Sequence, residues 1–126
     1  AEAVAQHLED HQKVAWVSYG GLRSSPSFKW KNRYFPKGCG GVFTFGLRGG
    51  YEAGVKLVEN CNLLSHLANV GDTRSLILHP ASTTHRQLTE EQQVAAGAGP
   101  EVVRISVGIE TVDDIIADLD QALSLV

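Results

Sequence analysis

The segment 102–107, Val-Val-Arg-Ile-Ser-Val, constrains the fold of this chain more than any other. Side chains alternate between the two faces of a β-strand, so Val103, Ile105 and Val107 form one apolar face while Arg104 and Ser106 point to the other. A helix with Thr111 as its N-cap follows, and its apolar stripe consists of Val112, Ile115, Ile116, Leu119 and Leu123. We expect the apolar face of the strand to pack against helices.

The rest of the chain alternates between strand and helix patterns. Further strands are expected over 14–18, 42–45 and 75–78, and further helices over 1–11, 51–59 and 89–97, the last opened by a Thr-x-x-Gln capping box. The pattern leaves 62–67 open between a short strand and an extended edge. Several strands follow one another without the crossover helix that parallel pairing needs. The sequence therefore predicts an α+β fold, a mostly antiparallel sheet with helices packed on one face.

Composition limits the classes of partner. The chain has 126 residues, enough for one packed core, and its formal net charge of -3 gives no field that attracts nucleic acid or an anionic membrane. No apolar run approaches the roughly 20 residues of a membrane helix, and no signal pattern is present. Cys39 and Cys61 show no CxxC spacing. We expect two reduced thiols in a cytoplasmic protein, with no membrane or nucleic-acid partner.

Charge is nevertheless unevenly distributed. A basic stretch without an acid contains Arg23, Lys29, Lys31, Arg33 and Lys37, interleaved with Phe28, Trp30, Tyr34 and Phe35. An acidic stretch without a base contains Glu110, Asp113, Asp114, Asp118 and Asp120. Basic and aromatic residues together are typical of a nucleic-acid surface, but the favoured interpretation is a solvated face whose aromatic side chains anchor the loop to the core. The connection 19–41 is also long, which is typical of functional loops or of loops packed on another domain.

Arg104 is the main candidate binding residue. An arginine in the middle of a strand, between β-branched residues, needs an anionic partner when it is even partly buried. Two alternatives remain open at this point. The guanidinium forms an internal salt bridge with an aspartate or glutamate, or it grips a ligand carboxylate through two parallel hydrogen bonds.

Two other segments contain candidate polar groups. In 65–72, Gly71 permits a tight turn and Asn69 offers both a donor and an acceptor. In 79–85, His79 and His85 match no standard metal-ligand spacing, so no metal site is expected. A triad of Ser82, His85 and Asp72 lacks a nucleophile elbow, and Gly38–Gly41 precedes a strand, the wrong order for a dinucleotide fingerprint.

The three segments together resemble a known family. In order and spacing, 65–72, 79–85 and 104–110 are similar to the Cys/Met-metabolism enzymes that depend on pyridoxal 5'-phosphate (PLP), and with 38–50 the likeness spans roughly 14–126. That family includes cystathionine γ-synthase, cystathionine lyases, methionine γ-lyase and acylhomoserine sulfhydrylases. The sequences Asn-Val-Gly-Asp (69–72) and Ser-Thr-Thr-His (82–85) are most similar to those of O-acetylhomoserine sulfhydrylases.

This resemblance implies a domain and a cofactor. Residues 1–126 would be a single domain, similar to the small C-terminal domain of fold-type I PLP enzymes. No segment resembles the family's cofactor-binding lysine, the aspartate that pairs with the pyridine nitrogen, or the residues that bind the cofactor phosphate. The larger cofactor-binding domain would therefore be absent. The chain would supply no catalytic residue, bind no PLP by itself and be inactive alone.

The resemblance also implies a reaction and site residues. The parent would be a transferase of methionine biosynthesis that replaces the acetate of O-acetyl-L-homoserine by sulfide to give homocysteine, as a homotetramer. Arg104 would hold the substrate α-carboxylate and Asn69 would lie at the substrate end of the site. His79, Thr84 and His85 would support the site structurally.

Two alternative functions remain. The parent could instead be a cystathionine γ-synthase, a cystathionine lyase or a methionine γ-lyase. In a different class, the chain could be a stand-alone, non-catalytic domain that binds an amino acid or mediates assembly. In the fragment interpretation, we expect larger exposed apolar patches than a typical monomer has.

Overall fold

One five-stranded sheet forms the centre of the molecule. The structure, a computed structural model, describes residues 1–126. The strands are β1 (Val14–Ser18), β2 (Val42–Leu47), β3 (Ser65–His66), β4 (Leu76–Leu78) and β5 (Val102–Ser106), in the spatial order β1-β2-β5-β4-β3. Every pairing is antiparallel except β3 with β4. This confirms the α+β, mostly antiparallel fold.

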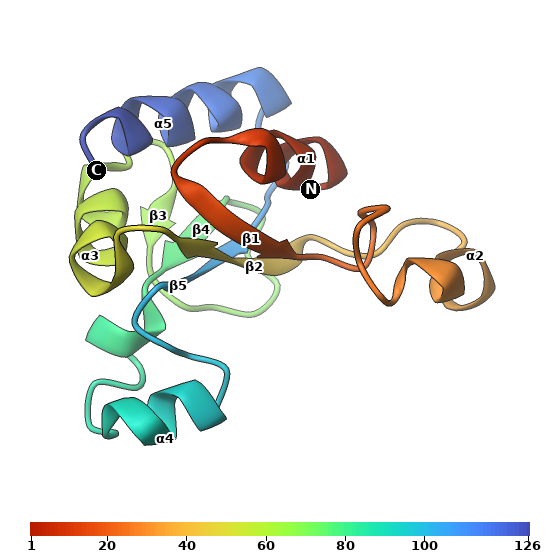
Figure 1. Cartoon of the computed structure of the whole chain (residues 1–126). Helices are drawn as coiled ribbons and strands as arrows, with labels where there is room; N and C mark the ends of the chain where they lie inside the picture. The colour runs from red at the N-terminus through yellow and green to blue at the C-terminus, as the bar shows by residue number, and fades with distance from the viewer.

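Three longer helices lie on one face of this sheet. These are α1 (Glu2–Asp10), α3 (Gly50–Asn60) and α5 (Val112–Ser124); in Figure 1, α1 and α5 lie above the strands and α3 lies to their left. Shorter elements lie outside that layer: the 3₁₀ turn η1 (Phe28–Trp30) with α2 (Lys31–Tyr34), and the 3₁₀ turn η2 (Pro80–Ser82) with α4 (Glu90–Ala95). The expected placement of helices on one face is confirmed for the three longer ones.

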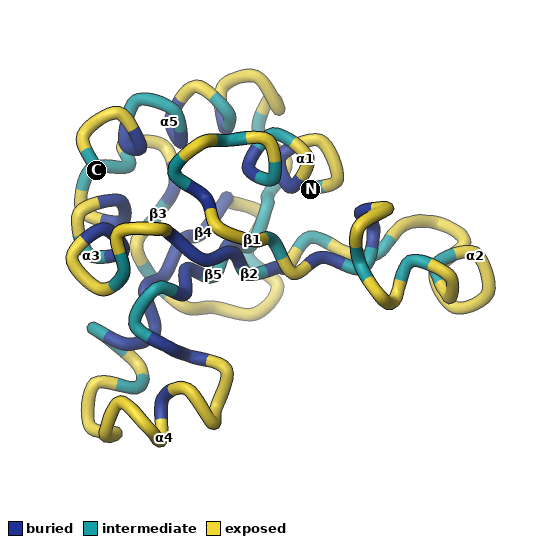
Figure 2. The backbone as a smooth tube through the Cα atoms, in the orientation of Figure 1, coloured by how far each residue is buried: buried dark blue, intermediate teal, exposed yellow.

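The core lies between the sheet and these three helices. Val103 and Ile105 of β5 are fully buried there, together with Phe45 of β2. From the helices come Leu8, Leu57, Ile115, Leu119 and Leu123. Figure 2 shows the buried segments concentrated where strands and helices meet. Each such side chain contributes about 1.5–3 kcal/mol by leaving water, so the apolar face of β5 has only one stable orientation.

The ends of two helices test the capping predictions. At α4, Thr89 accepts a hydrogen bond from the backbone N–H of Gln92, and the Gln92 side chain accepts one from the Thr89 N–H, which confirms the capping box. Thr111 does occupy the N-cap position of α5, but its side chain makes no capping hydrogen bond. Val112, predicted as part of the buried stripe, is 40% exposed. The first turn of α5 extends past the edge of the core, so this part of the stripe has nothing to pack against.

The connection 19–41 differs most from expectation. Tyr19 and Leu22 are buried where it leaves the sheet, but the following segment forms η1 and α2 and projects away from the core (Figure 2). Trp30, Tyr34 and Phe35 are 44%, 60% and 55% exposed. The interpretation that these aromatic side chains anchor the loop to the core is therefore wrong. We call residues 23–37 the arm.

No helix in this structure combines the length and apolarity needed to cross a membrane. Cys39 and Cys61 are both free thiols. Burial, assisted by the nearby Asp118 carboxylate, raises the pKa of the Cys61 thiol to about 12, so this thiol stays protonated at neutral pH.

Asp118 joins α5 to the turn that follows α3. Its carboxylate is buried and accepts hydrogen bonds from the backbone N–H groups of Asn62, Leu63 and Leu64, at 2.8, 2.9 and 3.0 Å. The Gln121 side chain donates a fourth, at 3.2 Å. This residue belongs to the acidic stretch of the sequence, yet it faces the interior and satisfies main-chain donors that would otherwise lack partners.

We therefore expect Asp118→Ala to destabilise the fold by roughly 3 kcal/mol, because buried main-chain donors lose a charged acceptor. Asp114→Ala, which removes an exposed carboxylate from the same helix, should cost less than about 1 kcal/mol. Chemical denaturation of both variants measures the difference. Equal losses of stability would contradict the role assigned to Asp118.

Candidate functional site

Arg104 lies at the middle of the central strand. Its cross-strand partners are Thr44 on β2 and Leu78 on β4, and all three side chains share the face that α1, α3 and α5 do not cover. The residue is partly buried, but it takes part in none of the three salt bridges of the molecule. The alternative that Arg104 forms an internal salt bridge is therefore wrong. Every fully buried polar side-chain atom in the molecule has a hydrogen-bond partner. The guanidinium of Arg104 has no such partner, so it must remain in contact with solvent.

A small pocket on this face contains both Arg104 and Asn69. Leu67, Leu78 and Ser106 also line it, and its volume of about 10 Å³ would hold one water molecule. The structure thus brings together two predicted binding residues that lie 35 positions apart in the sequence. What the pocket offers is one free guanidinium beside a carboxamide.

Asn69 also belongs to a turn that is held by hydrogen bonds among its own residues. Its side chain accepts from the Val70 N–H at 2.8 Å and donates to Asp72 at 3.3 Å. Arg74 donates two side-chain hydrogen bonds to Asp72, which hold the pKa of that carboxyl well below its ordinary value. Because Arg74 is engaged by Asp72, Arg104 is the unpaired cation at this pocket.

A second carboxylate, that of Glu110, joins the end of β5 to the start of β4 through hydrogen bonds. Glu110 accepts hydrogen bonds from the N–H and the hydroxyl of Ser75, both at 2.7 Å, and the Ser75 hydroxyl oxygen accepts from the Gly108 N–H at 2.9 Å. At Gly108 a Cβ would lie 2.3 Å from the Thr73 carbonyl oxygen, so only glycine permits this approach. The contacts fix the exit of β5 against the entrance to β4.

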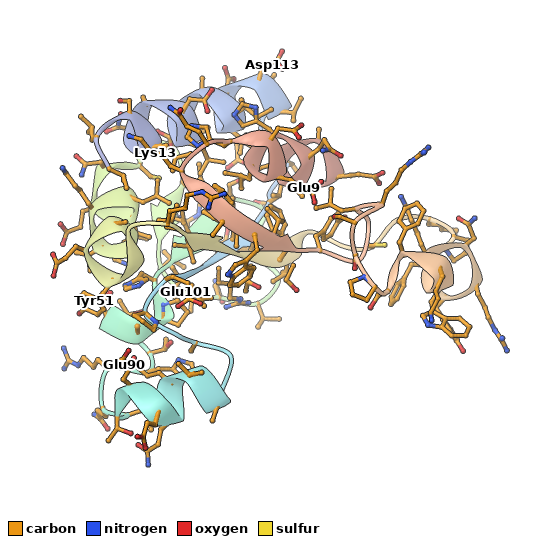
Figure 3. The ribbon with its side chains drawn as sticks, viewed as in Figure 1. Glu9, Lys13, Tyr51, Glu90, Glu101 and Asp113 are labelled. Carbon is orange, nitrogen blue, oxygen red and sulfur yellow. The ribbon has the colours of Figure 1, made fainter.

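His79 fastens the opposite ends of the same two strands. Its ring is fully buried, and Nε2 donates to the Pro100 carbonyl at 2.8 Å, which leaves Nδ1 to accept from the Ser82 hydroxyl at 2.9 Å. Burial lowers the pKa of His79 more than the hydrogen bond to Pro100 raises it, so the ring is neutral at pH 7. The Tyr51 ring, labelled in Figure 3, packs edge-on against it with centroids 5.1 Å apart. His79 therefore links the end of β4 to the residues before β5.

Thr84 and His85 lie outside the pocket. The Thr84 hydroxyl and His85 Nδ1 are 2.8 Å apart on the outer side of the segment, and the His85 carbonyl accepts from the Gln93 side chain at 3.0 Å. The Ser82 hydroxyl contacts His79 instead of His85, so no Ser-His-Asp triad is assembled. No group of three His, Cys, Asp or Glu side chains is placed to hold a metal ion. A supporting role for His79, Thr84 and His85 stays a prediction.

Sequence reasoning missed Ser75, Gly108 and Glu110. Ser75 precedes a short apolar strand and Glu110 belongs to an acidic stretch, so neither stands out by residue type. A glycine directly after the strongest strand pattern was the available signal, because close backbone approach is a common reason for glycine there.

The sequence of this chain is similar to those of known enzymes. The model of a family described as "Cys/Met metabolism PLP-dependent enzyme" matches residues 1–124. The chain is 51% identical over 121 residues to O-acetyl-L-homoserine sulfhydrylase 1 of Thermus thermophilus, covering 96% of this chain and 29% of the relative. It is 50% identical over 125 residues to homocysteine synthase of Schizosaccharomyces pombe, covering 99% and 29%.

A solved structure shares the fold. The crystal structure of a putative O-acetylhomoserine (thiol)-lyase from Campylobacter jejuni, with a pyridoxyl-lysine monophosphate, superposes with a TM-score of 0.89 at 38% identity. The match covers 98% of this chain and 30% of that one. The chain thus spans less than a third of the length of the relatives that it matches.

The contacts of Glu110 give a pH-dependent expectation. Desolvation raises its pKa, but the hydrogen bonds from Ser75 outweigh it and hold the pKa below the ordinary 4.5. A lowered folded-state pKa contributes stability that is present above pH 4.5 and is lost as pH falls through the folded value. We expect Glu110→Gln to reduce stability by about 1 kcal/mol at pH 7 and to differ progressively less from the unmodified chain below pH 4.5.

Urea denaturation from pH 7 to pH 3 measures this difference. Glu59→Gln, at an exposed position of α3, is the control and should have no such pH dependence. A difference for Glu110→Gln that is constant over the whole range would show that the charge of Glu110 has no part in fastening β5.

Proposed function

This chain belongs to the Cys/Met-metabolism family of PLP-dependent enzymes, and on that basis we propose that it is the substrate-carboxylate-binding domain of an O-acetylhomoserine sulfhydrylase. One observation carries the proposal: the guanidinium of Arg104 forms no salt bridge and shares a small pocket with Asn69, on the face of the sheet that α1, α3 and α5 do not cover. Residues 1–126 act as one small domain of the longer protein, and the cofactor-bearing domain is its partner.

Arg104 suits a carboxylate for reasons of geometry. A guanidinium presents parallel N–H donors that match the two oxygens of a carboxylate, and it stays charged at any physiological pH. Hydrogen-bonded strands on both sides fix the backbone at Arg104, so its side chain starts from a well-defined position. Orientation by such a rigid group contributes to rate, because reactivity falls quickly when a substrate is misplaced.

The residues of the pocket do not themselves form a PLP site. No lysine lines it, and its volume of about 10 Å³ is far too small for the cofactor. In the proposal, PLP is held by another part of the longer protein, where it supplies the stabilisation of substrate carbanions. This chain alone supplies no catalytic residue and is inactive.

In the proposed reaction, sulfide displaces acetate from O-acetyl-L-homoserine: a carbon–sulfur bond forms, a carbon–oxygen bond breaks, and homocysteine and acetate result. This chain contacts the end of the substrate opposite to the carbon at which sulfide replaces acetate. Arg104 binds the α-carboxylate, and Asn69 contributes a polar contact at the same end. His79, with Thr84 and His85 beyond it, supports the strands that hold Arg104. The longer protein works in the cytoplasm as a homotetramer.

The main test replaces Arg104 in the longer protein encoded by the gene. Loss of hydrogen bonds to a charged group costs about 1.5–3 kcal/mol, so Arg104→Ala should raise the KM for O-acetylhomoserine roughly 10- to 100-fold. Lys56→Ala, which removes one exposed positive charge from α3, is the control and should leave KM unchanged. Unaltered kinetics in Arg104→Ala would remove the carboxylate role.

Activity with sulfide and with cysteine as the nucleophile is measured in the same protein. Homocysteine from sulfide supports a sulfhydrylase, and cystathionine from cysteine would indicate a cystathionine γ-synthase instead.

A second test concerns the chain alone. Its lysines are Lys13, Lys29, Lys31, Lys37 and Lys56, and none lies in the pocket. After incubation with PLP and reduction by borohydride, we expect slow modification spread over several lysines, with no distinct absorbance band. Stoichiometric labelling of one lysine, measured by mass spectrometry, would contradict the assignment of the cofactor site to another part of the protein.

A further inference from the structure

Ser75 is completely buried, and all of its polar groups form hydrogen bonds. Its backbone N–H and its hydroxyl both donate to Glu110 at 2.7 Å, and the hydroxyl oxygen accepts from the Gly108 N–H at 2.9 Å. Its carbonyl accepts from the backbone N–H of Ser65, also at 2.9 Å. This one residue therefore joins the start of β4 to the start of β3 and to the segment that follows β5.

The segment that follows β5 leads back to Arg104. β4 and β5 lie side by side in the sheet (Figure 1), but β4 consists only of Leu76–Leu78, so their pairing is short. The hydrogen bonds of Ser75 extend the contact beyond the ends of both strands, together with one from the Ile109 N–H to the Thr73 carbonyl at 3.0 Å. These bonds limit how far β5 can shift relative to β4.

The segments that meet at Ser75 also lead to Asn69. That residue lies in an exposed turn between β3 and β4, and exposed turns are among the more mobile parts of a fold. Within the turn, Asn69 and Arg74 both donate to Asp72, and Arg74 directly precedes Ser75. At the other end of the turn, the start of β3 is bound to Ser75 through Ser65. Both ends of the turn are therefore held at Ser75.

We infer that Ser75 and Glu110 are positioning residues of the proposed carboxylate site, because they set the place of Asn69 relative to Arg104. Neither residue lines the pocket, so their effect is indirect and passes through the backbone. Two groups that bind the same end of a substrate must keep a fixed separation, and a small displacement of either weakens binding. The inference rests on the proposed function of Arg104.

Glu110 suits this role because each of its two carboxylate oxygens accepts one hydrogen bond from Ser75. A carboxamide has one acceptor oxygen and one NH₂ donor, so in Glu110→Gln one of the two Ser75 donors would face another donor. This variant changes the connection while the side-chain volume stays nearly the same. Ser75→Ala breaks the connection from the other side, because it removes the hydroxyl between Glu110 and Gly108.

Steady-state kinetics of the longer protein encoded by the gene test this inference. Glu110→Gln and Ser75→Ala should each raise the KM for O-acetylhomoserine roughly 2- to 10-fold, the range expected for the loss of one hydrogen bond, and leave kcat nearly unchanged. Glu59→Gln, at an exposed position of α3, is the control and should change neither constant. A variant that had only lost stability would contain less folded enzyme, which lowers the apparent kcat and leaves KM as it was.

A double-mutant cycle with Asn69 shows whether the effect passes through the pocket. Asn69→Ala removes the group that Ser75 and Glu110 position, so Glu110→Gln should raise KM less in the Asn69→Ala background than it does alone. If the two substitutions multiply their effects on KM, Glu110 acts independently of Asn69 and the inference is overturned.

The Arg104→Ala variant separates this inference from the proposed function. If Arg104→Ala raises KM while Glu110→Gln and Ser75→Ala do not, the positioning role is wrong and the carboxylate role stands. If Arg104→Ala leaves KM unchanged, both are wrong. Circular dichroism checks that each variant is folded, and either Glu110→Gln or Ser75→Ala is sufficient for the test.

Discussion

The packing of β5 against the helices is the constraint on which the rest of the structure depends. Val103 and Ile105 are fully buried between the central strands and the helices α3 and α5. Because side chains alternate along a strand, burial of these two forces the residue between them to the opposite face. Arg104 is thereby placed, partly buried, on the face that α1, α3 and α5 do not cover, although its neighbours in the sequence are among the most deeply buried in the molecule. A shift of register by one residue would bury the guanidinium and expose both apolar side chains.

Polar contacts over long sequence distances hold this strand in position. Glu110 and Ser75 fasten the exit of β5 to the entrance of β4, and His79 and Pro100 fasten the other ends of the same strands. Both connections bury their polar groups with partners, so the groups that become dehydrated keep their hydrogen bonds. A free cation on a strand that is held at both of its ends is well suited to orient an anionic ligand, and this arrangement supports the proposed role of Arg104.

The same chain leaves two other surfaces uncovered. The arm exposes aromatic and basic side chains, and the start of α5 exposes apolar and acidic ones. Both surfaces consist of segments that extend past the edge of the core, where the sheet and the helices offer nothing to cover them. The two surfaces have opposite charges because charged residues are unevenly distributed along the sequence. The basic residues lie at 23–37 and the acidic ones at 110–120.

The sequence by itself determined the fold class, most of the strands and helices, and the face of β5 on which Arg104 lies. These features depend on local periodicity, on capping residues and on the burial of apolar side chains, all of which can be read within a short window. The family could also be recognised from three segments in the right order. Only the tertiary structure decided that Arg104 lacks an acidic partner, that Asn69 lies beside it, and that Asp118 and Glu110 serve main-chain donors. It also decided that the arm projects from the core. Each of these depends on which distant residues become neighbours, and a partner 35 or more positions away leaves no periodic trace in the sequence.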